Sequence, residues 1–149
     1  MMNIPVFGEK IEGKNYQNRY GVYAIVARHD NTELCLVQAP NGAFFLPGGE
    51  IEANEDHIEA LNRELLEELG AEAQIGEYLG QADEYFYSSH RDRYYYNPAY
   101  LYDTDQVRFD QAPLEDFNGI FWFPVDEAKA KLKRGSHKWG VEQWKVRHL

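Results

Sequence analysis

The sequence predicts an α/β fold in which a single sheet is covered by helices on both faces. Three observations predict this class: β-prone apolar segments fill the first third of the chain, one segment of helical periodicity follows them, and further strands precede two terminal helical segments. The chain has 149 residues, of which 44% are apolar, which is enough for the core of one ordinary domain. We therefore expect residues 1–149 to form a single domain.

Three short strands are expected before the first helix. They cover residues 20–27, 34–38 and 44–46. Turn-forming pairs separate them, because Asp30-Asn31 follows the first strand and Asn41-Gly42 follows the second. A Pro-Gly-Gly sequence at residues 47–49 then interrupts the β pattern, and we expect it to break the sheet.

From about Asp56 the hydrophobic period becomes helical. The apolar residues that recur at three- and four-residue steps are Ile58, Leu61, Leu65 and Leu69. Asp56 followed by Glu59 matches an N-cap with a capping box, and Gly70 is typical of the position just after a helix end. We expect one amphipathic helix over residues 56–69.

The second half of the chain returns to strands and then to helices. Strands are expected over residues 74–87, 94–102 and 120–123, with a polar turn over residues 88–93. Helices are expected over residues 126–133 and 136–148. Residues 103–119 are acidic, and we expect them to form a loop.

Charge and composition exclude several classes of protein. The formal net charge of −10 argues against a nucleic-acid polymer as the main partner. No run of about 18 apolar residues exists, so we expect no membrane span. The first thirty residues are charged and hold no apolar core of a signal peptide, so we expect a cytoplasmic protein. Cys35 is the only cysteine, which excludes an internal disulfide, and we expect it to pack as a small hydrophobe.

The acidic charge is concentrated in one window. Residues 50–72 carry nine acidic side chains against Arg63 alone, a net of −8. From Lys129 to Arg147 the sign reverses, with seven Lys or Arg residues against Glu142. Solvated helix faces explain such charge runs in most proteins, so the spacing of the residues has to decide.

Glu64, Glu67 and Glu68 share one narrow sector of the expected helix. At about 100° per residue, they flank the apolar stripe rather than point away from it. Clustered carboxylates without Cys or His suit a hard cation, and Mg²⁺ or Mn²⁺ would neutralise diphosphate charge and acidify a bound water. The glycines before the helix let the main chain approach such an ion, where a carbonyl could add a ligand. Repulsion between like charges on an exposed helix is small, so a merely solvated face stays open as the alternative.

The residues from Gly49 to Ala71 follow fixed spacing: Gly49-x5-Glu55-x7-Arg63-Glu64-Leu65-x-Glu67-Glu68-x-Gly70-Ala71. This pattern resembles the Nudix box of the MutT-like pyrophosphohydrolases. It should arise by chance on the order of once in ten million chains of this length. A looser resemblance extends from about Arg19 to Arg134. Asn54, where many members have Gly, and Ala71, which is small for an apolar position, are departures that do not touch a ligand position.

The resemblance implies a Nudix-type α/β/α sandwich with a central mixed β-sheet. It implies metal ligands that are three box carboxylates and one main-chain carbonyl: Glu64, Glu67, Glu68 and Gly49. The metal would be Mg²⁺, with Mn²⁺ as a substitute. Glu55 and Arg63 would pair with each other and brace the loop against the helix.

The general base is less well defined by the resemblance. In the family it varies between a box glutamate and a carboxylate from a distant loop. Glu115 and Asp116 are the loop candidates here, and a solvated loop acid is the alternative for each. Our candidate catalytic residues are Glu64, Arg63 and Glu115.

Residues outside the box leave the substrate open. Seven of the eleven tyrosines lie between Tyr85 and Tyr102, and their rings could stack a base while Arg91 or Arg93 holds phosphate. Ordinary packing in a sheet is the alternative for these tyrosines. The last helix, which begins near His137-Lys138-Trp139, could hold an anion at its N-terminus or pack Trp139 on the sheet.

The resemblance implies a metal-dependent hydrolase that cleaves the diphosphate bond of a nucleoside diphosphate linked to another group. A Nudix-fold sensor that binds a nucleotide without turnover and a diphosphate isomerase are the alternatives. The presence of all box carboxylates favours the hydrolase. Oxidised deoxynucleoside triphosphates, ADP-ribose and dinucleoside polyphosphates stay open as substrates, and so does a homodimer.

Overall fold

Two β-sheets and three helices make up the part of the chain that the computed structural model describes, residues 3–115 and 119–149. The strands are β1 (Val6–Phe7), β2 (Tyr16–Asn18), β3 (Gly21–Ile25), β4 (Ala27–Arg28), β5 (Glu33–Gln38), β6 (Phe44–Phe45), β7 (Gly48–Glu50), β8 (Ala71–Ser88), β9 (Arg93–Phe109) and β10 (Gly119–Pro124). The helices are α1 (His57–Leu69), α2 (Val125–Lys131) and α3 (Gly135–His148). None of these three helices combines the length and the apolar character that a membrane span requires.

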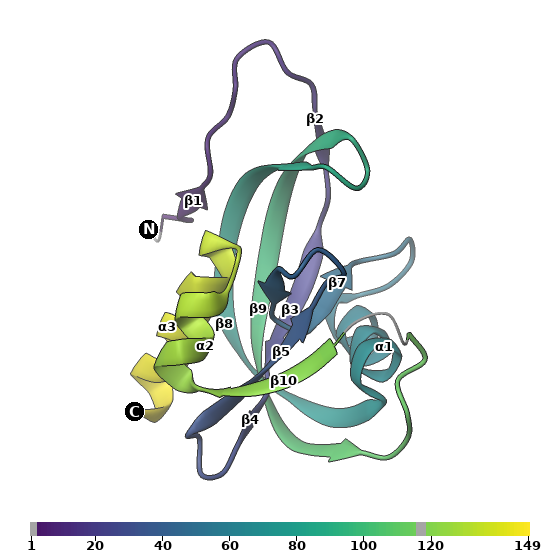
Figure 1. Ribbon diagram of the computed structural model, residues 1–149, viewed down its shortest axis with the longest axis vertical. Coiled ribbons are helices and arrows are strands. Elements are labelled where there is room, and N and C mark those ends of the chain that lie inside the picture. Colours follow the sequence, from purple (N-terminus) through teal and green to yellow (C-terminus); the bar gives the residue numbers. More distant parts are fainter. Residues whose placement is uncertain (1–2, 116–118) are drawn as a thin grey trace.

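The larger sheet is mixed, as predicted. Its strand order is β1-β8-β9-β3-β7, with β2 paired to β9 as well. β8 and β9 form a long antiparallel hairpin, β3 runs parallel to β9, and β7 runs antiparallel to β3. The smaller sheet has the order β10-β5-β4, with β6 paired to β5. In Figure 1, α1 lies on one side of these sheets and α2 and α3 lie on the other, so the α/β/α sandwich is confirmed.

The expected single sheet is divided at Val26. β3 pairs with β9 and β7, whereas β4, which follows Val26, pairs with β5. The Val26 carbonyl already accepts a hydrogen bond from the N–H of Cys35 in β5, at 2.8 Å. The strand therefore changes partners at this residue. The sequence is apolar on both sides of Val26 and does not mark the change.

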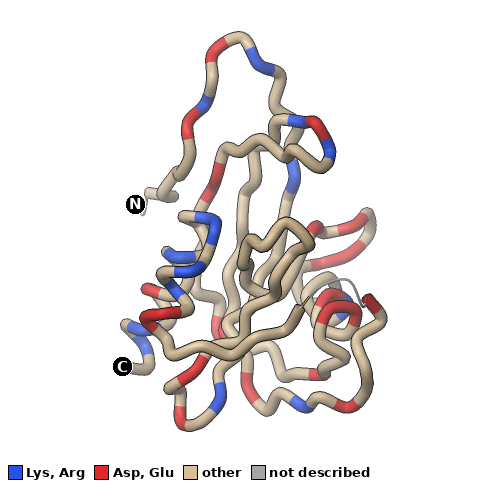
Figure 2. Tube along the Cα trace, in the orientation of Figure 1, with Lys and Arg blue, Asp and Glu red and all other residues tan. Residues whose placement is uncertain are grey.

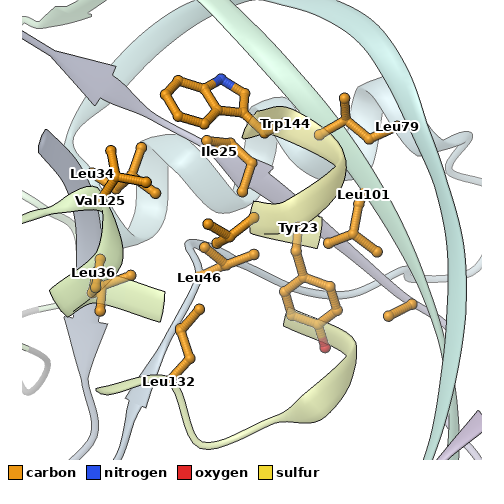
Figure 3. Packing of buried hydrophobic residues seen from close by; sticks show 13 residues of the cluster. Tyr23, Ile25, Leu34, Leu36, Leu46, Leu79, Leu101, Val125, Leu132 and Trp144 are labelled. Atoms are coloured by element: carbon orange, nitrogen blue, oxygen red, sulfur yellow. The ribbon is translucent and has the colours of Figure 1, made fainter. Parts of the chain in front are cut away.

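Side chains of the central strands alternate between two cores. In β3, Val22 and Ala24 pack with α1, whereas Tyr23 and Ile25 pack with α2 and α3. β5 alternates in the same way. Figure 3 shows the core on the α2–α3 side, which includes the fully buried Trp144. Strands buried on both faces are apolar at consecutive positions, which explains the continuous apolar run in β3.

The caps of α1 are those that the sequence predicts. The Asp56 side chain accepts the Glu59 N–H at 2.8 Å, and the Glu59 carboxylate accepts the Asp56 N–H at 3.1 Å. Gly70 follows the helix in the left-handed conformation, with φ 64°. A Cβ on Gly70 would lie 2.1 Å from the carbonyl oxygen of Gln111, so the residue has to be glycine for steric reasons as well.

The place of Ile58 in the apolar stripe of α1 was predicted wrongly. Ile58 is 42% exposed, and the buried stripe is formed by Ala60 together with the three leucines. The reason is that His57, rather than Ile58, faces the sheet in the first turn. The His57 ring packs on Tyr100 with 4.2 Å between ring centroids.

β9 extends to Phe109, through part of the segment expected to be a loop. Its last residues pair with the first residues of β8, with Arg108 opposite Glu72 and Phe109 opposite Ala71. Arg108 and Glu72 are exposed and form an ion pair at 2.7 Å. Acidic composition indicated a loop, but the partner strand, which local sequence does not reveal, provides the hydrogen bonds that keep the segment extended.

Candidate active site

The Pro-Gly-Gly sequence lies where the chain leaves the smaller sheet after β6, as the expected break predicts, but its two glycines then begin strand β7 of the larger sheet. Gly48 pairs with Tyr23 and Gly49 pairs with Val22 of β3. Gly48 has φ 142°, and a Cβ on it would lie 2.0 Å from the Val22 carbonyl oxygen. Only glycine permits this close approach to β3 at the first residue of β7.

The carboxylate of Glu64 lies directly against Gly49. A Cβ on Gly49 would be 2.7 Å from both Cδ and Oε1 of Glu64. Burial raises the pKa of Glu64 to about 7, against the lowering effect of the Arg63 guanidinium. The sequence predicted that this side chain flanks the buried face of α1, and the structure places it there.

Glu68 is the most buried of the three box carboxylates. Its residue is only 8% exposed, and its Oε1 accepts the Gly48 N–H at 2.7 Å. Burial raises the pKa of Glu68 well above its usual value, and the negative charges of Glu64 and Glu115 raise it further. A solvated helix face would leave this side chain in water, so the structure contradicts that alternative for Glu68.

Arg63 holds the loop before α1 to the helix. Its Nε and Nη2 donate to the two carboxylate oxygens of Glu55 at 2.6 and 2.9 Å, a bidentate pair of the kind expected. Nη2 also donates to the Glu50 carbonyl at 2.9 Å. The contact with Arg63 lowers the pKa of Glu55. The same guanidinium also contacts the box carboxylates, because Nη1 donates to Glu64 at 2.9 Å and to Glu67 at 3.3 Å.

Glu115 lies beside the box carboxylates although it follows them by a long stretch of sequence. Its N–H donates to the Glu67 carbonyl of α1 at 2.9 Å. The preceding residues Asp110 and Gln111 both donate to the Gly70 carbonyl, which ties the loop along the C-terminal half of α1. Burial, and then the charge of Glu67, raises the pKa of Glu115. The other loop candidate, Asp116, lies outside the described residues.

The donors at this site fit a hard divalent cation. Four carboxylates come together without a nitrogen or sulfur donor, and burial already raises the pKa of three of them, Glu64, Glu68 and Glu115. Over residues 3–115 and 119–149, no three acidic, histidine or cysteine side chains are spaced as ligands of one ion. In this arrangement the Arg63 guanidinium neutralises Glu64 and Glu67 instead. Figure 2 shows that acidic residues dominate the loop before α1 and α1 itself.

The other residues singled out by the sequence lie elsewhere. Arg91 and Arg93 are at the β8–β9 turn, at the far end of the hairpin from α1 (Figure 1), and Arg93 donates to Gln17 at 2.8 Å. Most tyrosines of the hairpin pack on one another, as Tyr85 does on Tyr96 with 4.7 Å between centroids. Packing therefore explains them better than base stacking.

His137 and Cys35 are structural. The Nδ1 of His137 accepts the Leu46 N–H at 3.1 Å in the core, and burial lowers the pKa of His137 to about 3. Cys35 is fully buried in β5, where burial raises the pKa of its thiol to about 12. Trp139 packs on the backbone of Gly80, as expected for a helix that covers the sheet.

Two arginines that the sequence did not single out contact strands β6, β7 and β8. Arg19 pairs with Glu50 of β7 at 3.0 Å, and Arg134 lies over Phe45 and Phe86 at the start of α3. Their partners are distant in the sequence, so no local pattern could have identified them. A cavity of about 680 Å³ lies away from all these groups, between β4, the last part of β9 and β10, and is lined by Arg28, Phe109 and Trp122 among others.

Comparison with known proteins agrees with this geometry. The model of the NUDIX domain family matches residues 17–144. No curated protein sequence matches the chain. Among solved structures, the E. coli ORF135 protein is 24% identical with a TM-score of 0.66, over 88% of this chain and 91% of that one. A NUDIX hydrolase from Nitrosomonas europaea is 21% identical with a TM-score of 0.66, over 89% and 91%. The MutT protein from Methanosarcina mazei Go1 is 20% identical with a TM-score of 0.69, over 93% and 98%. At these identities, the structures show a common fold.

Proposed function

The chain belongs to the Nudix family of hydrolases, which act on phosphorus-containing acid anhydrides, and on this premise we propose that it is a Mg²⁺-dependent pyrophosphohydrolase. Its substrate is a small molecule in which a nucleoside diphosphate is linked to another group. The observation that carries the proposal is the contact of two box carboxylates, Glu64 and Glu68, with the Gly48–Gly49 turn in a site where burial raises the pKa of both. Such a concentration of desolvated negative charge is suited to a divalent cation.

Glu64, Glu67, Glu68 and the Gly49 carbonyl would hold the metal. When bound, Mg²⁺ neutralises diphosphate charge and lowers the pKa of a coordinated water, and Mn²⁺ can do the same. The Glu64 carboxylate lies against Gly49, and this closeness supports a joint role for the side chain of one residue and the carbonyl of the other.

Arg63 positions the site through several hydrogen bonds at once. It connects Glu55 and the Glu50 carbonyl of the loop to Glu64 and Glu67 on α1. The loop and helix are thereby kept in one geometry before substrate binds. Arg63 also offsets the repulsion between the carboxylates of Glu64 and Glu67.

We assign proton abstraction to Glu115. It lies on a separate loop, its N–H is fixed to Glu67, and a raised pKa brings its carboxylate closer to the pH at which a general base is most effective. Glu64 is the alternative base, with a pKa of about 7. The two assignments differ in their effect on metal binding, because only Glu64 is also a proposed ligand.

The test is hydrolysis of a substrate panel by the purified protein with and without Mg²⁺. Oxidised deoxynucleoside triphosphates, ADP-ribose and dinucleoside polyphosphates are scored by released phosphate or pyrophosphate. We expect metal-dependent release from at least one of them, and its loss in Glu68→Gln. Nucleotide binding without release would identify a sensor, and conversion of a diphosphate without release would identify an isomerase. Either result would overturn the proposal.

A further inference from the structure

Two aromatic rings form a shelf on the α3 side of the β8–β9 hairpin. Phe86 and Tyr95 are directly opposite each other in the antiparallel register, so their side chains point to the same face. Their ring centroids are 5.6 Å apart and their planes are inclined by 36°. Each ring of this pair is covered by an arginine from another part of the chain.

Arg134 covers Phe86 at the start of α3. Its guanidinium carbon is 3.6 Å from the centroid of Phe86 and 5.5 Å from that of Phe45, so the planar group lies on one ring and beside the other. Within the described residues, the Arg134 guanidinium forms no hydrogen bond or ion pair, although the backbone carbonyl of Arg134 accepts the Lys138 N–H at 3.1 Å. The carboxylate of Glu84 is nearby, but its Oε1 accepts the Ser136 N–H at 2.9 Å. The Ser136 hydroxyl is buried and also has no partner among the described residues.

Arg19 covers the other ring. Its guanidinium carbon is 5.8 Å from the centroid of Tyr95, and its Nη1 donates to Glu50 of β7 at 3.0 Å. Glu50 follows Gly49, against which the carboxylate of Glu64 lies. Arg19 therefore connects the aromatic shelf to strand β7, whose Gly49 lies against the proposed metal ligand Glu64.

Tyr23 lies within the electrostatic influence of both arginines and of Glu64. Its ring lies on His137, with 4.3 Å between centroids, and its hydroxyl reaches back to within 2.6 Å of where a Cβ on Gly21 would be. The charges of Arg19, Arg134 and Glu64 all act on the pKa of Tyr23, so all three groups lie close to one side chain. The two cations thus border a common region of the α3 face, and the box carboxylate is close enough for its charge to act on Tyr23.

The charge of Arg134 is only partly compensated. Burial lowers the pKa of Arg134, the negative charge of Glu84 opposes this effect, and the positive charge of Arg19 adds to it. In a chain with a net charge of −10, a desolvated guanidinium without an ion pair is unfavourable unless a ligand supplies negative charge. The rings that could have stacked a base at this place are occupied by guanidinium groups. The surface is therefore suited to an oxyanion.

We propose that Arg134 and Arg19 form an anion subsite that binds a phosphate group of the substrate other than the diphosphate held at the α1 carboxylates. This inference rests on the proposed function and narrows its substrate class. Substrates with a longer phosphate chain, such as nucleoside triphosphates or dinucleoside polyphosphates, gain a contact that ADP-ribose lacks. Arg134 presents a planar fork of N–H donors that matches phosphate geometry.

The first test uses metal-free protein, so that it does not depend on the carboxylate site. Inorganic tripolyphosphate is titrated into wild type, Arg134→Gln, Arg19→Gln and the control Arg147→Gln in EDTA, at low and high salt, by calorimetry. Arg147 lies at the other end of α3, where it pairs with Glu77 at 3.2 Å. We expect salt-dependent binding by wild type and Arg147→Gln, and affinity about tenfold weaker or worse in the other two variants. Absence of binding to wild type, or equal affinity in all four proteins, would overturn the subsite.

A second set of measurements distinguishes a loss of folding from a loss of binding. It also distinguishes recognition of phosphate from recognition of a nucleobase. Arg134→Lys keeps the positive charge but lacks the planar set of guanidinium N–H donors. It should have the melting temperature of wild type. Its affinity for tripolyphosphate should be lower than that of wild type but higher than that of Arg134→Gln. Adenosine, which carries no phosphate, should bind equally to wild type and Arg134→Gln. An effect of Arg134→Gln on adenosine but not on tripolyphosphate would make this a base-binding surface and contradict the proposal.

The third measurement connects the subsite to turnover. With Mg²⁺, Arg134→Gln should raise KM for a nucleoside triphosphate about tenfold and change kcat by less than about threefold, while leaving KM for ADP-ribose unchanged. An equal change for both substrates would show that Arg134 supports the fold instead of binding phosphate. If the wild type has no hydrolase activity, the proposed function fails, whereas the metal-free binding result still decides the subsite.

Discussion

The carboxylate of Glu64 occupies the space in which a side chain on Gly49 would have to lie. A Cβ at Gly49 would be 2.7 Å from Cδ of Glu64, closer than real carbon atoms approach without bonding. Gly49 of the box and Glu64 are therefore one steric unit. This contact explains why a glycine precedes the helix by a fixed number of residues, and it leads directly to the first prediction.

Gly49→Ala should displace the Glu64 carboxylate and lower Mg²⁺-dependent hydrolysis by about tenfold or more. The control is Gly76→Ala, where an added Cβ would meet its nearest atom at 3.4 Å, an ordinary contact. Steady-state rates as a function of Mg²⁺ concentration measure both. Full activity in Gly49→Ala would show that the position of Glu64 is irrelevant to catalysis.

Replacement of Glu64, Glu67 or Glu68 by Gln should weaken Mg²⁺ binding and turnover by about ten- to a hundredfold, because one ligand charge is lost while the shape is kept. Without metal, the melting temperature should stay level or rise, because repulsion between neighbouring carboxylates decreases. Glu59→Gln is the matched control on the same helix, since Gln can still accept the Asp56 N–H. Metal titrations and metal-free melts test the series. Equal activity in all variants would show that the three carboxylates are only a solvated helix face and do not bind the metal.

Arg63→Ala should lower the melting temperature by about 5 °C as well as the activity, because it leaves Glu55, Glu64 and Glu67 without their shared counter-charge. Arg108→Ala removes an exposed pair with Glu72 and should leave the melting temperature nearly unchanged. Thermal denaturation followed by circular dichroism compares the two. An unchanged melting temperature together with lost activity would assign Arg63 to the chemistry.

Glu115→Gln should lower kcat and leave the affinity for Mg²⁺ unchanged, because Glu115 is assigned to proton transfer and not to the metal. The acid limb of the pH–rate profile should also disappear. Glu127→Gln, an exposed substitution on α2, is the control. If Glu115→Gln behaves like wild type in kcat and in pH profile while Glu64→Gln loses its acid limb, the base is Glu64.

His137 should make the protein less stable at acid pH. Its pKa is about 3 in the folded protein against 6.5 for an ordinary histidine, so between these values the unfolded chain binds a proton that the folded chain does not. The stabilising contribution is therefore complete above the higher value and is lost as the pH falls toward the lower one. At about pH 5 the loss amounts to roughly 2 kcal/mol.

The measurement is the free energy of unfolding at about pH 7.5 and about pH 5. The matched variant is His137→Asn, whose Oδ1 can accept the Leu46 N–H but does not titrate. Wild type should lose more stability on acidification than His137→Asn. The carboxylates of α1 titrate in both proteins, so the difference between the two isolates His137. Parallel losses would show that His137 is protonated in the folded state.

The sequence was informative where the interactions are local. The capping box of Asp56 and Glu59, the left-handed Gly70 and the shared sector of Glu64, Glu67 and Glu68 all depend on residues three or four positions apart on one helix. Strand positions were predicted less well. Val26, at which the chain changes sheets, and the extension of β9 to Phe109 depend on which strand lies alongside, and the same apolar or charged residues are compatible with either outcome.

The sequence by itself determined the box, its helix and the chemical character of its carboxylates, because the regular geometry of an α-helix converts residue spacing into positions in space. Only the tertiary structure decided which groups from elsewhere join them. Arg19 meets Glu50 from 31 residues away, the backbone of Glu115 is fixed to Glu67, and Arg134 at the start of α3 covers the ring of Phe86 on β8. The depth of burial, which raises the pKa of Glu64 and Glu68, also arises from packing of the whole chain. Contacts between distant segments and the exclusion of water follow from the assembled fold, and no local spacing encodes them.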